Sequence, residues 1–130
     1  MTARATATFE ITGWEETPYD VPADGPTLVR TTVKKTFQGD LTGQSVAELL
    51  MCQAEGGAGY VAAERIVGRI ADRAGTFVLQ HGGTQDGDAS HAFGTVVPGS
   101  GTGALVGLRG TAAFQHDETG ATLTLEYDLP

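Results

Sequence analysis

The sequence predicts an all-β protein whose antiparallel strands close into a single barrel. Short segments in which apolar and polar side chains alternate recur along the chain, and turns rich in glycine, proline and aspartate separate them. Glycine supplies 19 of the 130 residues, about twice its usual share, which suits a sheet with many turns and bends. Seven or eight such strands, each joined to the next by a short link, lose their exposed edges when they close on themselves.

Length and composition limit the classes to which the protein can belong. A chain of 130 residues with 40% hydrophobic and 18% charged residues is expected to form one globular domain, residues 1–130. The formal charge of −8 argues against nucleic acids and anionic membranes as partners, because both require a basic surface. Cys52 is the single cysteine, and no apolar signal segment or run of about 18 apolar residues occurs, so we expect a cytoplasmic protein without a disulfide.

The first third of the chain contains two predicted strands and a polar segment between them. Ala5–Trp14 alternates, with Phe9 and Ile11 on one face, as in a half-buried strand. Glu15–Pro26 holds three prolines and four acids and is expected to form a long polar loop or flap. Leu28–Phe37, rich in valine and threonine, is expected to form the second strand.

The segment Leu41–Cys52 allows two interpretations. Ser45 to Glu48 has the form of a helix capping box, and good helix formers follow it. A strand is equally compatible with its position after the turn at Gly39–Asp40. The residues themselves leave helix and strand open.

A central hairpin is predicted for Gly59–Gly83, with a tight turn at Asp72–Gly75. This turn places Ile66 opposite His81 and leaves Glu64 diagonal to His81, about 7 Å away at the backbone. Because side chains alternate across a strand, one face carries Tyr60, Ala62, Glu64, Ile66, Ile70, Phe77, Leu79 and His81. The other face interleaves Val61, Ala63, Val67 and Val78 with Arg65 and Arg69. The first face is therefore expected to line the barrel interior.

Three further strands and two loops complete the predicted chain. Gly82–Ser90 is expected to be a polar loop, and Ala92–Val97 a short strand that ends at a proline. After a glycine-rich loop, Ala104–Phe114 is expected to be a strand bent at its glycines. Ala121–Leu129 alternates cleanly and is expected to close the barrel.

Several segments of the chain recur in the same order in a known family. They are ATATFEITGW, TFQGDLTGQSVAELLM, YVAAERIVGRIADRAGTFVLQHGG, VVPGSGTGALVGLRGTAAF and LTLEYDL. The chain resembles a bacterial family known only as a domain of unknown function, which in turn is similar to the allene oxide cyclase type of barrel and, more loosely, to the calycins. The resemblance implies a single eight-stranded antiparallel up-and-down barrel, and so favours a strand at Leu41–Cys52. It implies no agreed activity, although related barrels include cyclases that work without a cofactor.

Glu64, His81 and Tyr60 are the candidate catalytic residues. A carboxylate on an apolar inner wall is expected to have a raised pKa and to exchange protons, with an imidazole or a phenol to assist it. The simpler alternative is a buried pair with a structural role, or a glutamate that meets water at the barrel mouth. If the role is structural, Glu64→Gln is expected to leave stability unchanged or to raise it, because an unneeded buried charge is removed.

An interior ligand site is the second candidate feature. Its expected lining residues are Trp14, Ile66, Phe77, Leu79 and Tyr127, since ligand pockets are mostly apolar and aromatic, although plain core packing explains them equally well. We expect no metal and no organic cofactor. The three histidines lack ligand spacing, Pro98–Gly103 lacks the lysine of a phosphate-binding loop, and no GxSxG nucleophile motif is present.

These features lead to one function hypothesis and two alternatives. We expect an interior cavity that binds a small, mostly apolar molecule, with cofactor-independent isomerisation or cyclisation as the reaction to be tested. The alternatives are a binding protein without turnover and a structural or interaction module with a filled interior. The apolar patch around Arg65 and Arg69 further predicts a homo-oligomer.

Overall fold

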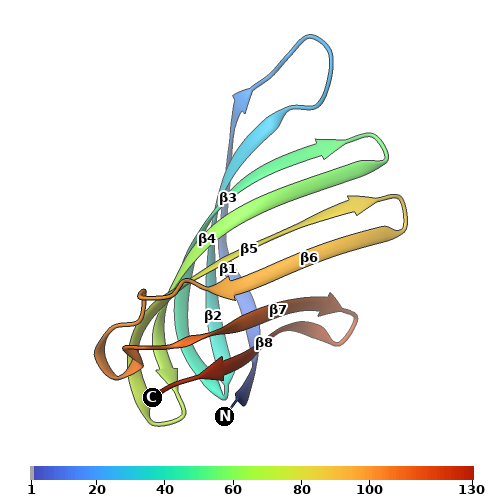
Figure 1. The fold of residues 1–130 in the computed structure, drawn as a ribbon. Coiled ribbons are helices and arrows are strands. Elements are labelled where there is room, and N and C mark those ends of the chain that lie inside the picture. Colours follow the sequence, from blue (N-terminus) through green and yellow to red (C-terminus); the bar gives the residue numbers. More distant parts are fainter. Residues whose placement is uncertain (1) are drawn as a thin grey trace.

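The computed structural model describes residues 2–130, which form a closed antiparallel β-barrel of eight strands in the order β1 to β8 (Figure 1). The strands are β1 Ala3–Asp20, β2 Leu28–Gly39, β3 Leu41–Ala54, β4 Gly57–Ile70, β5 Arg73–Asp86, β6 Ala89–Val96, β7 Arg109–Asp117 and β8 Gly120–Asp128, with a 3-10 turn, η1, at Gly103–Leu105. The predicted all-β, eight-stranded up-and-down barrel is confirmed. Within residues 2–130, no helix has the length and apolar character needed to cross a lipid bilayer.

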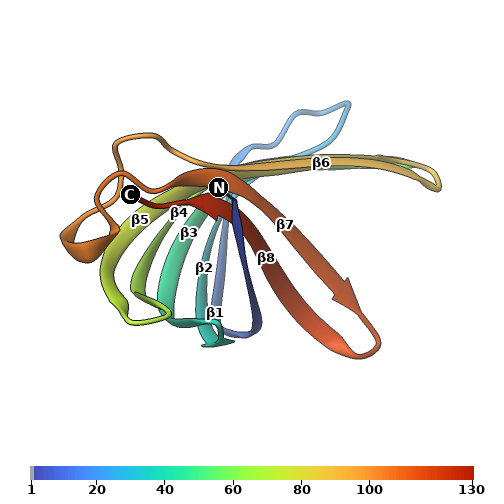
Figure 2. The same cartoon turned by 60° about the horizontal axis from the view of Figure 1, so that its bottom comes forward.

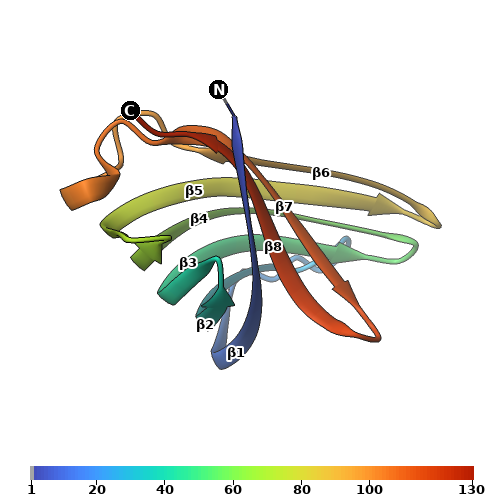
Figure 3. The same ribbon diagram turned by 90° about the horizontal axis from the view of Figure 1, so that it is seen from below.

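The two ends of the barrel differ. The hairpins β1–β2, β3–β4, β5–β6 and β7–β8 all turn at one end and splay apart there, and we call it the wide end (Figure 1). The turns β2–β3 and β4–β5, the β6–β7 connection and both termini lie at the other, narrow end. Strands β1 to β5 curve strongly around the interior (Figures 2 and 3). The barrel closes between β6 and β7 through a single residue pair, Thr95 with Thr111.

The narrow end is a packed core. Its fully buried side chains come from all sides of the barrel and include Phe37, Leu41, Ile66, Ile70, Phe77, Leu79, Leu123 and Leu125. The connection 97–108 covers this end, because Leu105 and Leu108 insert into the same core. The hydroxyls of Ser100 and Thr102 accept hydrogen bonds from the backbone N–H groups of Val78 and Thr76, which fixes the connection onto β5.

The ambiguous segment Leu41–Cys52 is a strand and belongs to β3. Burial alternates along it, with Leu41, Ser45, Ala47 and Leu49 facing inward. Ser45, the residue that suggested a helix cap, instead donates a side-chain hydrogen bond to Glu64 inside the barrel. The barrel implied by the family resemblance is therefore the better guide here, because tertiary contacts override a local capping signal.

The predicted register of the central hairpin is wrong by four residues. Ile66 lies opposite Phe77, not His81, and His81 lies opposite Ala62. The strands stay paired to a two-residue turn at Ala71–Asp72, where Ala71 adopts a positive φ of 54°. Because the shift is an even number of residues, every side chain keeps its predicted face.

Three loop and strand boundaries also differ from prediction. β1 extends through Asp20 and pairs with β2 to its end, so most of the predicted Glu15–Pro26 loop is strand or turn of a long hairpin. The predicted loop Gly82–Ser90 is likewise a paired hairpin of β5 and β6. The predicted strand Ala104–Phe114 starts late, at Arg109, because the preceding residues form η1 and the narrow-end cover. The two hairpins project beyond the core, where both faces are exposed and no alternation marks a strand.

Candidate functional site

A buried carboxylate at the middle of the barrel is the centre of the candidate site. Glu64 projects inward from β4 and is 0% exposed. Lys35 Nζ on β2 donates to Glu64 Oε1 at 3.1 Å, and Ser45 Oγ on β3 donates to Oε2 at 2.6 Å. His81 Nε2 on β5 lies 2.8 Å from Oε1, and it is the donor because an ionised carboxylate only accepts. Four adjacent strands thus converge on one carboxylate.

The imidazole of His81 extends this cluster to a phenol. The Tyr60 hydroxyl lies 2.9 Å from His81 Nδ1, and in the neutral imidazole that nitrogen accepts a hydrogen bond from the phenol O–H. The structure therefore brings together the three residues named as catalytic candidates, in the order Tyr60–His81–Glu64. Glu64 stays diagonal to His81 in the observed register, since its direct cross-strand partner is Leu79.

The electrostatics of Glu64 correct the sequence-based expectation of a raised pKa. Burial does raise the pKa of the Glu64 carboxyl, but the hydrogen bond from His81, the charge of Lys35 and the hydrogen bond from Ser45 outweigh it, so the pKa lies below its ordinary value. Burial, and then the negative charge of Glu64, raise the pKa of the Tyr60 phenol. The cluster consequently holds an ionised carboxylate and a neutral phenol at neutral pH.

Aromatic rings surround the charged atoms of the cluster. Lys35 Nζ lies 4.8 Å from the ring centroid of Phe9 and 4.4 Å from that of Phe114, both within cation–π distance. The His81 ring lies 4.5 Å from the Phe114 ring, centroid to centroid. Among the described residues, no buried side-chain nitrogen or oxygen lacks a hydrogen-bond partner.

An interior cavity of about 320 Å³ extends from this cluster toward the wide end, where its lining residues Trp14, Met51 and His116 lie. Its lining is mostly apolar and aromatic, and consists of Phe9, Ile11, Trp14, Val33, Lys35, Leu49, Met51, Tyr60, His81, Phe114, Gln115 and His116. Lys35 and His81 are almost completely buried, so the cavity has a polar floor and apolar walls. The barrel is thus packed at one end and hollow at the other.

The predicted ligand-binding residues lie in two different places. Trp14 lines the cavity, and a β-bulge between Ile11 and Gly13 is what turns it inward, opposite Val33. Ile66, Phe77 and Leu79 belong to the packed core below the site. Tyr127 packs against the same core and lies beside the turn that follows β4, at the narrow end.

Lys35 and Ser45 contact Glu64 directly, yet sequence reasoning missed them, as it missed the Phe9 and Phe114 rings that flank Lys35. One signal for Lys35 was present. Adjacent residues of a strand point to opposite faces, so one of Lys34 and Lys35 had to face the interior, and Lys35 shares the parity of buried Val33 and Phe37. No comparable sequence signal marked Ser45, because its segment was itself ambiguous.

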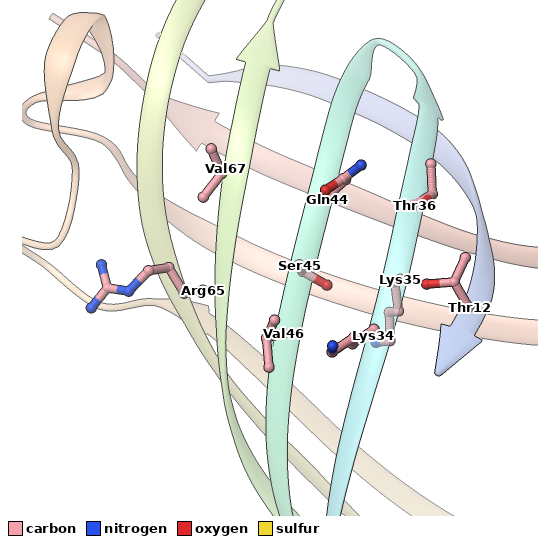
Figure 4. A pocket seen from close by; sticks show the side chains of 9 residues that line it. All are labelled: Thr12, Lys34, Lys35, Thr36, Gln44, Ser45, Val46, Arg65 and Val67. Atoms are coloured by element: carbon pink, nitrogen blue, oxygen red, sulfur yellow. The ribbon is translucent and has the colours of Figure 1, made fainter. Parts of the chain in front are cut away.

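A second concavity lies on the outer side of the same wall. It measures about 620 Å³ and is lined by side chains of β1 to β4, among them Lys34, Gln44, Val46, Arg65 and Val67 (Figure 4). These side chains are exposed, and no carboxylate lines it. Residues 2–130 also contain no group of three or more histidine, cysteine or acidic side chains placed to hold a metal ion. The inner cluster is therefore the stronger candidate site.

Comparison with known proteins places the chain in a family. The family model described as "Protein of unknown function (DUF3224)" matches residues 5–129. A crystal structure of a DUF3224 protein of unknown function from Shewanella oneidensis MR-1 is 32% identical in sequence and superposes with a TM-score of 0.86, over 100% of this chain and 99% of that one. A search of curated proteins gave no match. The chain belongs to the DUF3224 family.

Proposed function

We propose that the protein binds a small, mostly apolar molecule in the interior cavity at its wide end. The observation that carries this proposal is the cavity itself, about 320 Å³ with aromatic and aliphatic walls and three polar groups, Lys35, Tyr60 and His81, at its inner end. Pockets of this size and lining are typical of small-molecule sites. The volume corresponds to about ten water molecules, so the ligand is small.

A direct binding experiment tests this proposal. The neutral dye N-phenyl-1-naphthylamine should gain fluorescence when it enters the apolar cavity. Ile11→Phe narrows the cavity from its lining and should weaken dye binding by about tenfold, an effect of about 1.4 kcal/mol. Val67→Phe is the matched control, because Val67 is an exposed apolar residue on the outer wall. Equal binding by all three proteins, or none by the parent protein, would show that the cavity is not a binding site.

The second candidate function is cofactor-independent isomerisation or cyclisation of the bound molecule. The specific observation in its favour is the hydrogen-bonded order Tyr60–His81–Glu64, with Tyr60 lining the cavity. When the phenol oxygen takes a proton from a bound molecule, its own proton passes to His81 Nδ1, and the Glu64 carboxylate stabilises the imidazolium. The proton then returns to another atom of the molecule, so the reaction is an isomerisation. The resemblance to allene oxide cyclase-type barrels that we infer from the sequence supports this by fold analogy alone.

A matched pair of variants tests the catalytic role. Tyr60→Phe removes one hydroxyl from the chain but keeps the ring, so ligand binding should persist while turnover of any bound substrate falls by about 10²-fold or more. Tyr127→Phe makes the same chemical change at the narrow end and should leave turnover unchanged. Turnover by Tyr60→Phe at the parent rate would rule out the proton relay and leave binding without catalysis.

A further inference from the structure

Lys35 presents hydrogen-bond donors that the protein itself does not use. An ammonium group has three N–H donors and no acceptor. Among the described residues, one acceptor, Glu64 Oε1, lies within hydrogen-bond distance of Lys35 Nζ, and the other close neighbours are the rings of Phe9 and Phe114. The side chain is 9% exposed and lines the cavity. A ligand oxygen at the inner end of the cavity would therefore lie next to the nearly buried Lys35 ammonium. It could accept a hydrogen bond from one of the N–H groups that do not bond to Glu64.

The balanced charges of the cluster favour a neutral acceptor on the ligand for a second reason. The charges of Lys35 and Glu64 balance each other, so the floor holds a dipole rather than a net charge. A ligand carbonyl oxygen is an acceptor without a proton of its own, which matches the donor-only ammonium. A bare hydrocarbon would leave those donors facing an apolar surface, and this costs free energy when a polar group is buried.

The mouth of the cavity disfavours an anionic ligand. Nine of the sixteen acidic residues lie on the exposed outer parts of the four wide-end hairpins, and they are Glu15, Glu16, Asp20, Asp24, Glu55, Asp86, Asp88, Asp117 and Glu118. All nine are exposed, and residues 15–27, 54–57, 85–90 and 115–120 contain no lysine or arginine. These like charges at the wide end repel anions that approach the opening, most strongly at low salt.

We infer that the cavity takes a neutral, mostly apolar compound with a carbonyl oxygen, and that this oxygen accepts a hydrogen bond from Lys35. The inference rests on the proposed function and narrows its ligand class. If the bound compound is isomerised by proton transfer next to its carbonyl, the same ammonium would stabilise the oxygen as it gains negative charge. Lys35 then both positions the molecule and selects for it.

Three bicyclic compounds of equal size and shape separate the possibilities by calorimetry. They are 2-acetylnaphthalene, in which the oxygen is a ketone; 2-isopropenylnaphthalene, in which CH₂ replaces that oxygen; and 2-naphthoate, in which it belongs to a carboxylate. We expect the ketone to bind about tenfold or more tightly than the alkene. The carboxylate should bind more weakly than the ketone at about 20 mM salt and should gain affinity at about 300 mM, as the mouth charges are screened.

Variants then assign the preference to Lys35. The double variant Lys35→Met/Glu64→Gln removes both buried charges together, so no unpaired ion stays inside, and it should bind ketone and alkene equally. Lys34→Met is the matched control on the outer face and should keep the preference of the parent protein. Should the double variant not fold, the comparison of the three ligands on the parent protein decides alone.

The outcomes distinguish the two proposals. Equal binding of ketone and alkene by the parent protein, or tightest binding of the carboxylate, overturns the inference about ligand class but leaves the cavity as a binding site. Failure of all three compounds to bind, together with failure of the dye, overturns the proposed function and this inference with it.

Discussion

At the scale of single residues, the buried charges of Glu64 and Lys35 depend on each other. Both are nearly inaccessible to water, and they form an ion pair at 3.1 Å. We predict that Glu64→Gln lowers the free energy of unfolding by about 3–5 kcal/mol, because it leaves a buried ammonium without its counter-charge. Urea unfolding measures this. The sequence alone, in which Lys35 was not recognised as a partner, predicted unchanged or raised stability for a structural role of Glu64. An unchanged or increased stability would therefore show that the ion pair contributes nothing.

A double-variant cycle gives the control for that prediction. Lys35→Met should also destabilise, but the loss in Lys35→Met/Glu64→Gln should be clearly smaller than the sum of the two single losses, since the double variant leaves no unpaired charge. Glu118→Gln makes the same chemical change in an exposed turn and should alter stability by less than about 0.5 kcal/mol. Additive losses would mean that the two side chains act independently.

The lowered pKa of Glu64 makes a second prediction, about pH. A carboxyl whose pKa is lower in the folded than in the unfolded state adds stability above its unfolded pKa, about 4.3, and this is lost as pH falls through the folded pKa. The unfolding free energy should therefore decline below about pH 4.5, and less steeply in Glu64→Gln. Thermal or urea unfolding between pH 3 and 7 measures both slopes, with Glu118→Gln as reference. Parallel slopes for the parent protein and Glu64→Gln would contradict the assigned shift.

The direction of that pKa shift could not be read from the sequence, although the inward position of Glu64 could. The alternation of Tyr60, Ala62 and Ile66 with Arg65 is enough to place Glu64 on the inner face. The sign depends on the hydrogen bond from His81 together with Lys35 and Ser45. The last two come from β2 and β3 and reach Glu64 only through the closure and register of the sheet. Local alternation patterns in the sequence do not show which residues of separate strands contact each other.

At the scale of elements, the alternation of side chains along a strand predicted correctly which residues face the interior. The sequence did not predict correctly where the strands end. The β4–β5 register could slip by four residues in prediction without moving a side chain to the wrong face. In contrast, residues 15–20 of β1 are exposed on both sides, so their composition resembled a loop. Pairing with β2 makes them a strand, and that pairing continues through Pro18 to Asp20. Alternation of apolar and polar residues in a sequence identifies a strand only where one of its faces is buried.

The closure between β6 and β7 should be the weakest seam of the barrel. Thr95 and Thr111 are its single residue pair, whereas β3 and β4 pair along their whole length. We predict that hydrogen exchange is faster in β7 than in β3 and β4, and faster still in Gly94→Ala. A Cβ at Gly94 would meet the backbone oxygen of Ala112 at 2.3 Å and force β7 away.

Gly59→Ala is the matched control for the seam. A Cβ there would make a contact of 3.4 Å with the side chain of Thr84, close to an ordinary distance, so exchange in β7 should match the parent protein. Mass spectrometry of peptic peptides resolves the strands. Uniform exchange across β3, β4 and β7, or no change in Gly94→Ala, would mean that the seam is as stable as the rest of the barrel.

At the scale of the whole molecule, we predict an assembly surface on the outer face of β2 to β4, which extends the patch around Arg65 and Arg69 of the central hairpin onto the two preceding strands. Val46, Leu50, Val61 and Val67 are each about half exposed there, and the same face holds Arg30, Lys34, Arg65 and Arg69 with Glu48 as the one acid among them. If two copies meet through this face, their cations approach each other, so added salt should strengthen the assembly.

Sedimentation at two salt concentrations tests this fourth prediction. We expect a species larger than the 13.4 kDa chain, more populated at high salt, and reduced to the monomer by Val61→Asp. Val106→Asp changes an exposed valine away from this face, in the narrow-end connection, and should not affect assembly. A monomer at every protein and salt concentration would contradict the prediction.

The separation of a packed narrow end from a hollow wide end has a consequence for how this fold can diverge. The narrow core and its covering connection hold most of the buried apolar surface, whereas the four wide-end hairpin turns are exposed and contribute little to it. Substitutions, insertions or deletions in those turns can therefore accumulate at small cost to folding. One barrel can in this way keep the same packed narrow end while the shape and charge of its wide end change.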